Sequence, residues 1–201
     1  MLIPTLDELL HPETQAPDIR AAVSVAAELD PIRLFDITWK REGGVPHVLV
    51  PPEVSGVDAT ILIISGRHFP TGSHKVGPAY SCAREKLISG EIRQDGSTLV
   101  FPSTGNYGIG GAWVGPRLGF RSLVVLPEEM SAERFEKIRA YGAEVIATPG
   151  SESNVKEIYD EVGRLRADPN NRILNQFEEM GNYRFHYHVT GNSIAELVAE
   201  L

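Results

Sequence analysis

The chain has 201 residues, of which 42% are hydrophobic, so it can bury a sizeable core as one or two domains. Its 19 basic and 27 acidic residues give a net charge of −8, which argues against nucleic acid or an anionic membrane as a main partner. The single cysteine, Cys82, excludes an internal disulfide framework and a multi-cysteine zinc site. No signal peptide and no membrane-length apolar run are present, so we expect a cytoplasmic protein.

The N-terminal residues 1–45 differ in pattern from the rest of the chain. TLDELL (5–10) and PDIRAAVSVAAELD (17–30) predict one or two short helices. REGGVPHVLVPPEVSG (41–56) is rich in proline and glycine and predicts irregular structure with a short edge strand at HVLV. We therefore expect a helical extension over 1–45 and a second unit over 46–201.

From about residue 58, short apolar runs alternate with helical patterns. The runs are rich in β-branched residues and predict strands at 59–65, 97–103, 122–127, 144–149 and 172–177. Helices are predicted at 76–89, 108–118, 131–141, 153–166 and 190–201. This alternation predicts an α/β fold, in which a parallel sheet has helices on both faces and so forms three layers. The first run, ATILIIS (59–65), predicts a buried strand.

Two polar segments follow predicted strands, where parallel sheets bind ligands. TGSHK (71–75) precedes a helix, and so does the glycine-rich loop PSTGNYGIGGA (102–112). The glycines of the loop would let a ligand approach the backbone, and a helix start favours an anion such as carboxylate or phosphate. The spacing fits neither a dinucleotide motif nor a P-loop. The alternative is a tight strand–helix turn that binds nothing.

Lys75 can be interpreted in two ways. Most lysines are solvated surface charges. A lysine at the mouth of a parallel sheet can instead form a Schiff base, which requires a neutral amine. Pyridoxal phosphate is the usual cofactor for that chemistry.

Five stretches in chain order resemble the tryptophan-synthase-β-like, or fold-type II, pyridoxal-phosphate enzymes. PTGSHK (70–75) resembles the segment that bears the cofactor lysine, and the loop at 102–112 resembles the loop for the substrate carboxylate. Residues 123–150, NQFEE (175–179) and RFHYHVTGNSI (184–194) resemble the segments that follow. Within the family, the chain looks most like cysteine synthase and cystathionine β-synthase. The resemblance covers about 46–201 and implies the N-terminal part of a catalytic domain, without the family's later phosphate-binding loop.

The resemblance implies a role for each matching residue. Lys75 would hold pyridoxal 5′-phosphate and later move the substrate α-proton, with His74 and Asn106 as further cofactor ligands. The substrate carboxylate would be bound by Ser103, Thr104, Gly105, Asn106 and Gln176.

The implied reaction is β-replacement on a β-substituted amino acid through an aminoacrylate. The alternatives are β-elimination or deamination of a hydroxy or thio amino acid, or a non-catalytic fragment that needs a second chain. A homodimer is expected, or a second chain that supplies the C-terminal half. Val76, His74 and Tyr107 depart from the cysteine synthase pattern and leave the substrate and nucleophile open.

Two further residue types have plainer interpretations. Cys82 falls within a predicted helix and is interpreted as a small buried hydrophobic residue. His186 and His188 alternate with aromatic residues, but a metal site usually needs three or four protein ligands, so no metal is predicted there.

Overall fold

The computed structural model describes residues 2–42 and 44–201. Residue 43 belongs to the segment predicted as irregular at 41–56 and, like residue 1, lies outside the described residues. The N-terminal elements are α1 (Leu6–Leu10), the 3₁₀ turn η1 (Pro12–Thr14), α2 (Pro17–Val25), the 3₁₀ turn η2 (Pro31–Asp36), β1 (His47–Val50), α3 (Pro52–Ser55) and β2 (Ile61–Ile64).

The elements that follow alternate between helix and strand, as the sequence predicted. They are α4 (Val76–Ser89), β3 (Thr98–Pro102), α5 (Asn106–Arg117), β4 (Arg121–Pro127), α6 (Ala132–Ala140), β5 (Glu144–Thr148), α7 (Val155–Leu165) and β6 (Asn171–Ile173). The chain ends in α8 (Met180–Phe185), a π-helical turn η3 (His186–Gly191) and α9 (Asn192–Glu200). No helix in the described part of the chain is long and apolar enough to cross a bilayer.

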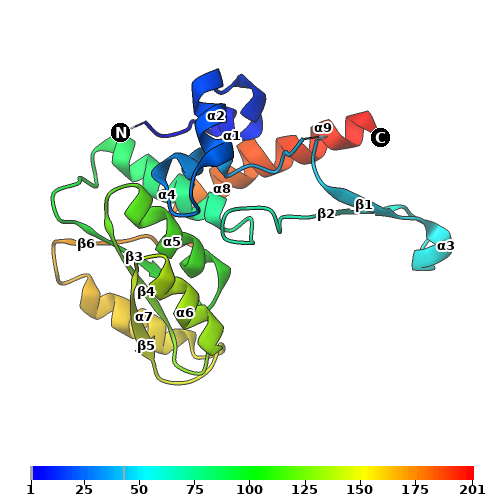
Figure 1. Cartoon of the computed structure of the whole chain (residues 1–201). Coiled ribbons are helices and arrows are strands. Elements are labelled where there is room, and N and C mark those ends of the chain that lie inside the picture. Colours follow the sequence, from blue (N-terminus) through cyan, green and yellow to red (C-terminus); the bar gives the residue numbers. More distant parts are fainter. Residues whose placement is uncertain (1, 43) are drawn as a thin grey trace.

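A four-stranded parallel sheet in the order β5-β4-β3-β6 lies at the centre of the α/β unit (Figure 1). Because side chains alternate along a strand, β3 and β4 supply two separate clusters. Phe101 and Val124 join the core formed with α4 and α5, whereas Val100 and Val125 pack against Ile158 on α7. The predicted three-layer α/β fold is therefore confirmed.

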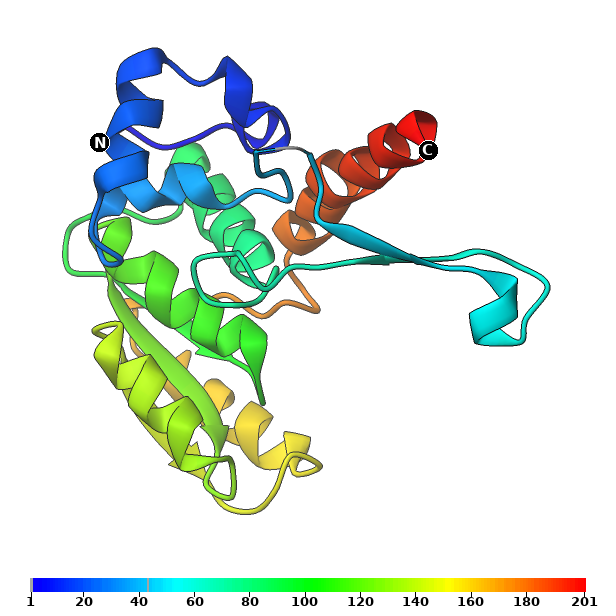
Figure 2. The same ribbon diagram turned by 45° about the vertical axis from the view of Figure 1, so that its right-hand side comes forward.

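The strand predicted at 59–65 does not belong to this sheet. Among the described residues, β2 pairs only with β1, in an antiparallel ribbon that projects from the body of the molecule (Figure 2). Ile61 and Ile63 are 41% and 51% exposed, so the prediction of a buried strand is wrong. The physical reason is local pairing: HVLV lies close enough in sequence to form a hairpin with ILII, and an apolar run does not specify which strand it pairs with.

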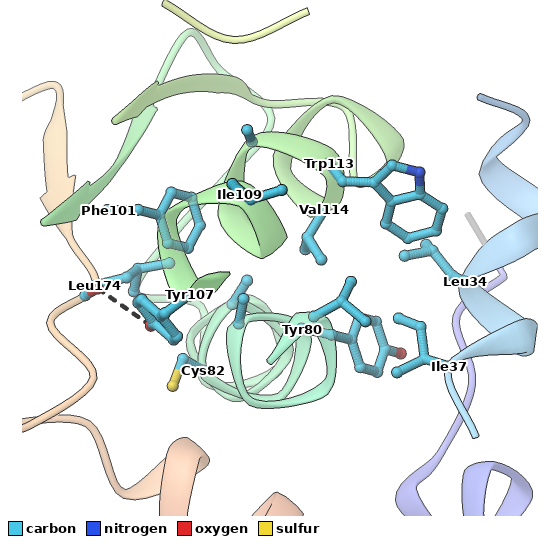
Figure 3. Packing of buried hydrophobic residues seen from close by; sticks show 14 of the residues in the cluster. Leu34, Ile37, Tyr80, Cys82, Phe101, Tyr107, Ile109, Trp113, Val114 and Leu174 are labelled. Atoms are coloured by element: carbon cyan, nitrogen blue, oxygen red, sulfur yellow. Dashed lines mark hydrogen bonds between the residues drawn. The ribbon is translucent and has the colours of Figure 1, made fainter. Parts of the chain in front are cut away.

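The N-terminal helices pack onto the α/β unit. Thr5 and Glu8 form a reciprocal capping box at the start of α1, and Leu9 on the same helix is fully buried. Leu34 and Ile37 belong to the same core as α4 and α5, and Figure 3 shows them facing Tyr80 and Trp113. The N-terminal helices predicted from the sequence are confirmed, while the division into units at residue 45 stays a prediction.

Candidate active site

Lys75 lies immediately before α4, where the loop after the β1–β2 ribbon turns into the helix. Its side chain is half-buried, and its Nζ donates to Oε1 of Gln176 over 3.4 Å. The two residues are 101 positions apart in sequence. The contact therefore joins the lysine segment to the chain that leaves β6, and it brings together two residues that the sequence predicted for one site.

The carboxyl ends of β3 and β6 bring the other predicted residues together. These strands are parallel neighbours, so the chains that follow them leave the sheet at the same edge. Ser103, Thr104 and Gln176 line one small pocket of about 130 Å³, together with Phe177 and residues of α7. The start of the 102–112 loop and Gln176 are therefore adjacent.

Two helices begin at this site without a side-chain cap. Lys75 is the residue before α4, and Gly105 is the residue before α5; neither helix start has a side-chain cap. At α4 the N–H groups of Val76 and Gly77 already donate to backbone oxygens of the preceding turn, so the α5 start is the one suited to a ligand. Within the described residues, a Cβ added to Gly105 would meet no atom within 4 Å, so space lies in front of the α5 start. Uncapped helix N-termini with space before them are suited to binding an anionic group.

Among the described residues, only some of the hydrogen-bonding groups of the loop have partners. Oγ of Ser103 accepts the backbone N–H of Gly105 over 3.1 Å, and the backbone oxygen of Thr104 accepts from Arg134 over 3.1 Å. Asn106 is exposed, and no hydrogen bond within the described part of the chain uses its side chain. The amide of Asn106 thus faces solvent at the first residue of α5.

The other glycines of the loop have a packing role that the sequence interpretation missed. Gly108, Gly110 and Gly111 lie inside α5, which begins at residue 106 and not at 108. A Cβ on Gly111 would lie 2.2 Å from the Phe101 ring, and one on Gly110 would lie 2.9 Å from Cα of Val76. The expectation that these three glycines admit a ligand is therefore wrong, because their missing side chains let α5 contact β3, β4 and the start of α4.

Tyr107, one of the departures from the cysteine synthase pattern, points into the core and away from the loop. Its ring is 1% exposed, and its hydroxyl donates to the backbone oxygen of Leu174 over 3.1 Å (Figure 3). Cys82 is fully buried beside it, and burial raises the pKa of the Cys82 thiol to about 12. The interpretation of Cys82 as a buried hydrophobic residue is confirmed.

Aromatic rings surround the residue before Lys75, and sequence reasoning missed most of them. The His74 ring stacks on Trp39 with 5.5 Å between centroids and meets the edge of His186 at 5.7 Å. Burial lowers the pKa of His74, and the charge of Lys75 lowers it further. His186 comes from the π-helical turn, a feature that often marks functional sites. Trp39 stands in no sequence motif, so only the structure reveals its position.

The environment of His186 predicts a pH dependence of stability. Burial lowers its pKa to about 4, with smaller contributions from the charges of Lys75 and His74. The ordinary histidine pKa is about 6.5, so between these two values the unfolded chain binds a proton that the folded chain does not. Stability is therefore full above about pH 6.5 and falls as the pH drops toward 4.

This pH dependence can be measured by urea unfolding at about pH 7.5 and about pH 4.5. Between these two pH values, the free energy of unfolding should fall by about 1–2 kcal/mol more in wild type than in His186→Asn. This value allows for the partial solvent exposure of the ring. His68 and His74 also have lowered pKa values, but both remain in the variant, so the difference between the two proteins reports His186 together with its coupling to the adjacent His74. Equal losses in the two proteins would contradict the assignment to His186.

Residues 43–201 match the family described as pyridoxal-phosphate dependent enzyme. Cystathionine beta-synthase of Saccharomyces cerevisiae is 35% identical over 159 residues, which are 75% of this chain and 30% of that protein. Cysteine synthase B of Pseudomonas aeruginosa is 32% identical over 152 residues, which are 76% of this chain and 50% of that protein.

A solved structure shows the same architecture. The O-acetylserine dependent cystathionine beta-synthase from Helicobacter pylori superposes with a TM-score of 0.69 at 27% identity. The match covers 75% of this chain and 50% of that one. This chain thus spans half or less of the length of these three relatives.

Proposed function

Because the chain belongs to the pyridoxal-phosphate-dependent enzyme family, we propose that it carries the lysine half of a site for β-replacement on a β-substituted amino acid. The observation that carries this proposal is the contact between Lys75 and Gln176, beside the loop that ends β3. The names of the relatives support the reaction class, since they are cysteine synthases and cystathionine beta-synthases.

The residues present fit the cofactor. A half-buried primary amine supplies one group for covalent attachment, and the uncapped start of α5 supplies N–H donors for an anion. Lys75, His74 and Asn106 would hold the cofactor. When bound, pyridoxal phosphate withdraws electrons from the amino acid and makes its Cα–H bond acidic.

The protein's own groups would then orient the substrate and move its proton. The hydroxyls of Ser103 and Thr104, with the start of α5 at Gly105 and Asn106, would bind the substrate carboxylate, and Gln176 would border it. Lys75 would take the proton from Cα and return it at the end. The β-substituent leaves with its bonding electron pair, and the nucleophile supplies the pair for the new bond to Cβ.

Val76 does not bear on this assignment, although it departs from the cysteine synthase pattern. Its side chain is fully buried, and its backbone lies against Gly110 on α5. The residue after the lysine therefore contributes to packing between α4 and α5.

The proposed reaction is tested by giving the protein, with pyridoxal phosphate, O-acetylserine, O-phosphoserine, serine and threonine separately, with and without sulfide. Formation of a thiol amino acid only when sulfide is present supports β-replacement. Release of a 2-oxo acid and ammonia at equal rates in both conditions would show elimination instead. No product from any of the four, despite cofactor uptake at Lys75, would favour the non-catalytic alternative.

Asn106→Ala should weaken substrate binding and leave the fold intact. The side chain is exposed and has no hydrogen-bond partner within the described residues, so its removal should change the free energy of unfolding by less than about 0.5 kcal/mol. One or two lost hydrogen bonds to a bound anion should raise the amino-acid Kd by about 10-fold or more. Spectral titration of the cofactor-loaded protein measures this Kd, and an unchanged value would exclude the role.

We also propose that the active protein is an assembly, either a homodimer or a complex with a second chain that supplies the other half of the site. Large apolar side chains exposed on the β1–β2 ribbon, such as Val48 at 59% and Ile63 at 51%, support a partner surface. Light scattering distinguishes a 22.0 kDa monomer from a dimer. A monomer that nevertheless catalyses β-replacement alone would contradict both forms of the proposal.

A further inference from the structure

Trp39 lies outside the segment that matches the family, yet it borders the residue next to Lys75. The family match begins at residue 43. The indole is 3% exposed and stacks on His74 with an angle of 25° between the ring planes. It also packs edge-on against Phe69, so the ring is fixed from two sides of the loop that leads to Lys75.

A second contact connects Trp39 to the π-helical turn. Its Nε1–H donates to Oγ1 of Thr190 over 2.9 Å, between residues 151 positions apart in sequence. Oγ1 of Thr190 lies 3.2 Å from Nδ1 of His186. The edge of the His186 imidazole contacts His74, which stacks on Trp39. The contacts therefore form a closed circuit through Trp39, Thr190, His186 and His74.

The chemistry of these groups indicates which nitrogen of His186 carries the proton. An indole N–H can only donate, so Thr190 accepts from Trp39 and has one hydroxyl proton left to donate. Within the described part of the chain, the other hydrogen-bond partner of that hydroxyl is Nδ1 of His186. The hydroxyl has a second lone pair that can accept Nδ1–H, but its own proton would then have no acceptor among the described residues. The arrangement in which the hydroxyl donates to Nδ1 satisfies both groups, and it places the imidazole proton on Nε2 of a neutral ring. The pKa of about 4 that burial gives His186 agrees with a neutral ring.

We infer that Trp39 is a positioning residue, which orients His74 by stacking and holds His186 in its neutral Nε2–H form through Thr190. The functional meaning of this inference rests on the proposed role of Lys75. His186 would then present its Nε2–H as one defined donor, beside the oriented His74 ring and the amine of Lys75. The N-terminal segment, for which the sequence offered no role, thus contributes to the site from outside the family match.

The tautomer can be measured in the complete chain without any cofactor, by ¹⁵N NMR of the imidazole nitrogens at neutral pH. Wild type should show His186 protonated at Nε2. Thr190→Val removes both hydrogen bonds and should give a mixture of tautomers, whereas Thr190→Ser keeps the hydroxyl and should retain the wild-type signature. Trp39→Phe keeps a ring against His74 but loses the N–H, and it should also give a mixture.

Trp113→Phe is the matched control. Trp113 is fully buried in the core, and its Nε1 has no hydrogen-bond partner among the described residues. This variant loses an indole without losing a hydrogen bond at the site, so its His186 tautomer should equal that of wild type. If Trp39→Phe does not fold, the comparison of Thr190→Val with Thr190→Ser still shows whether the Thr190 hydroxyl fixes the His186 tautomer.

The second readout is the affinity for pyridoxal phosphate, followed by the absorbance of the lysine-bound cofactor. Trp39→Phe and Thr190→Val should bind about 3- to 10-fold more weakly than wild type, and Thr190→Ser should bind equally well. An unchanged tautomer in both Trp39→Phe and Thr190→Val would overturn the inference, and so would unchanged cofactor affinity in both. If wild type does not take up the cofactor at Lys75, the proposed function fails, while the NMR comparison still decides whether Trp39 positions the two histidines.

Discussion

Lys75→Ala is expected to abolish covalent attachment of the cofactor and to lower turnover by at least about 10²–10⁴-fold, the usual effect of losing a proton-transfer group. The fold should tolerate this change. The side chain is half-buried, and its hydrogen bond to Gln176 is long, at 3.4 Å. We therefore expect the free energy of unfolding to change by less than about 1 kcal/mol. Borohydride reduction followed by peptide mapping locates the attached cofactor.

Lys156→Ala provides the control for this experiment. Lys156 lies on α7, is 80% exposed, and pairs with Asp160 on the same helix. It shares the amine chemistry of Lys75 but lies at the surface, so its loss should change neither cofactor attachment nor turnover. Reduced cofactor found on a peptide other than the one that contains Lys75, or attachment that persists in Lys75→Ala, would show that the assignment is wrong.

The regular part of the fold follows from local sequence signals. The helix predicted at 76–89 matches α4 residue for residue, and the strands predicted at 97–103, 122–127 and 144–149 each match a parallel strand within one or two residues. These segments have strong periodicity and clear breakers at their ends, so little depends on distant parts of the chain. The helix predicted at 131–141 likewise matches α6 within one residue at each end.

What the sequence could not predict depends on contacts between distant segments. ILII predicts a buried strand, yet it pairs locally with HVLV, and its alternate residues Ile61 and Ile63 stay exposed. The chain predicted as a strand over 172–177 is extended only at Asn171–Ile173, after which it turns to place Gln176 beside Lys75. No local pattern marks Trp39, and the resemblance at 184–194 gives no role to Thr190, because their contact arises only where the N-terminal segment meets the π-helical turn.

The contacts of the glycines in the 102–112 loop could not be predicted from the sequence either. A glycine-rich run after a strand predicts close approach of the backbone, but it does not say what approaches. In this chain the approaching groups belong to the protein: Phe101 contacts Gly111, and the start of α4 contacts Gly110. The packing still serves the site, because it brings α5 against the residues that hold Lys75.

Gly110→Ala is therefore expected to destabilise the protein and to disturb Lys75 in the same step. The added Cβ would lie 2.9 Å from Cα of Val76 and 3.0 Å from the backbone oxygen of Lys75. Both are backbone atoms and cannot rotate away, so α5 and the start of α4 must separate. Overpacking of this kind costs about 1–3 kcal/mol, which urea unfolding measures. Displacement of Lys75 should also weaken cofactor binding.

Gly163→Ala separates this effect from the intrinsic preference of a helix for alanine. Gly163 lies inside α7, and a Cβ there would meet nothing within 4 Å among the described residues. The same substitution should stabilise the protein by about 0.5–1 kcal/mol at this position, because alanine loses less conformational entropy in a helix than glycine does. Opposite signs for the two variants are the expected result. If Gly110→Ala also stabilises the protein and leaves cofactor binding unchanged, the contact between α5 and the lysine segment does not position Lys75.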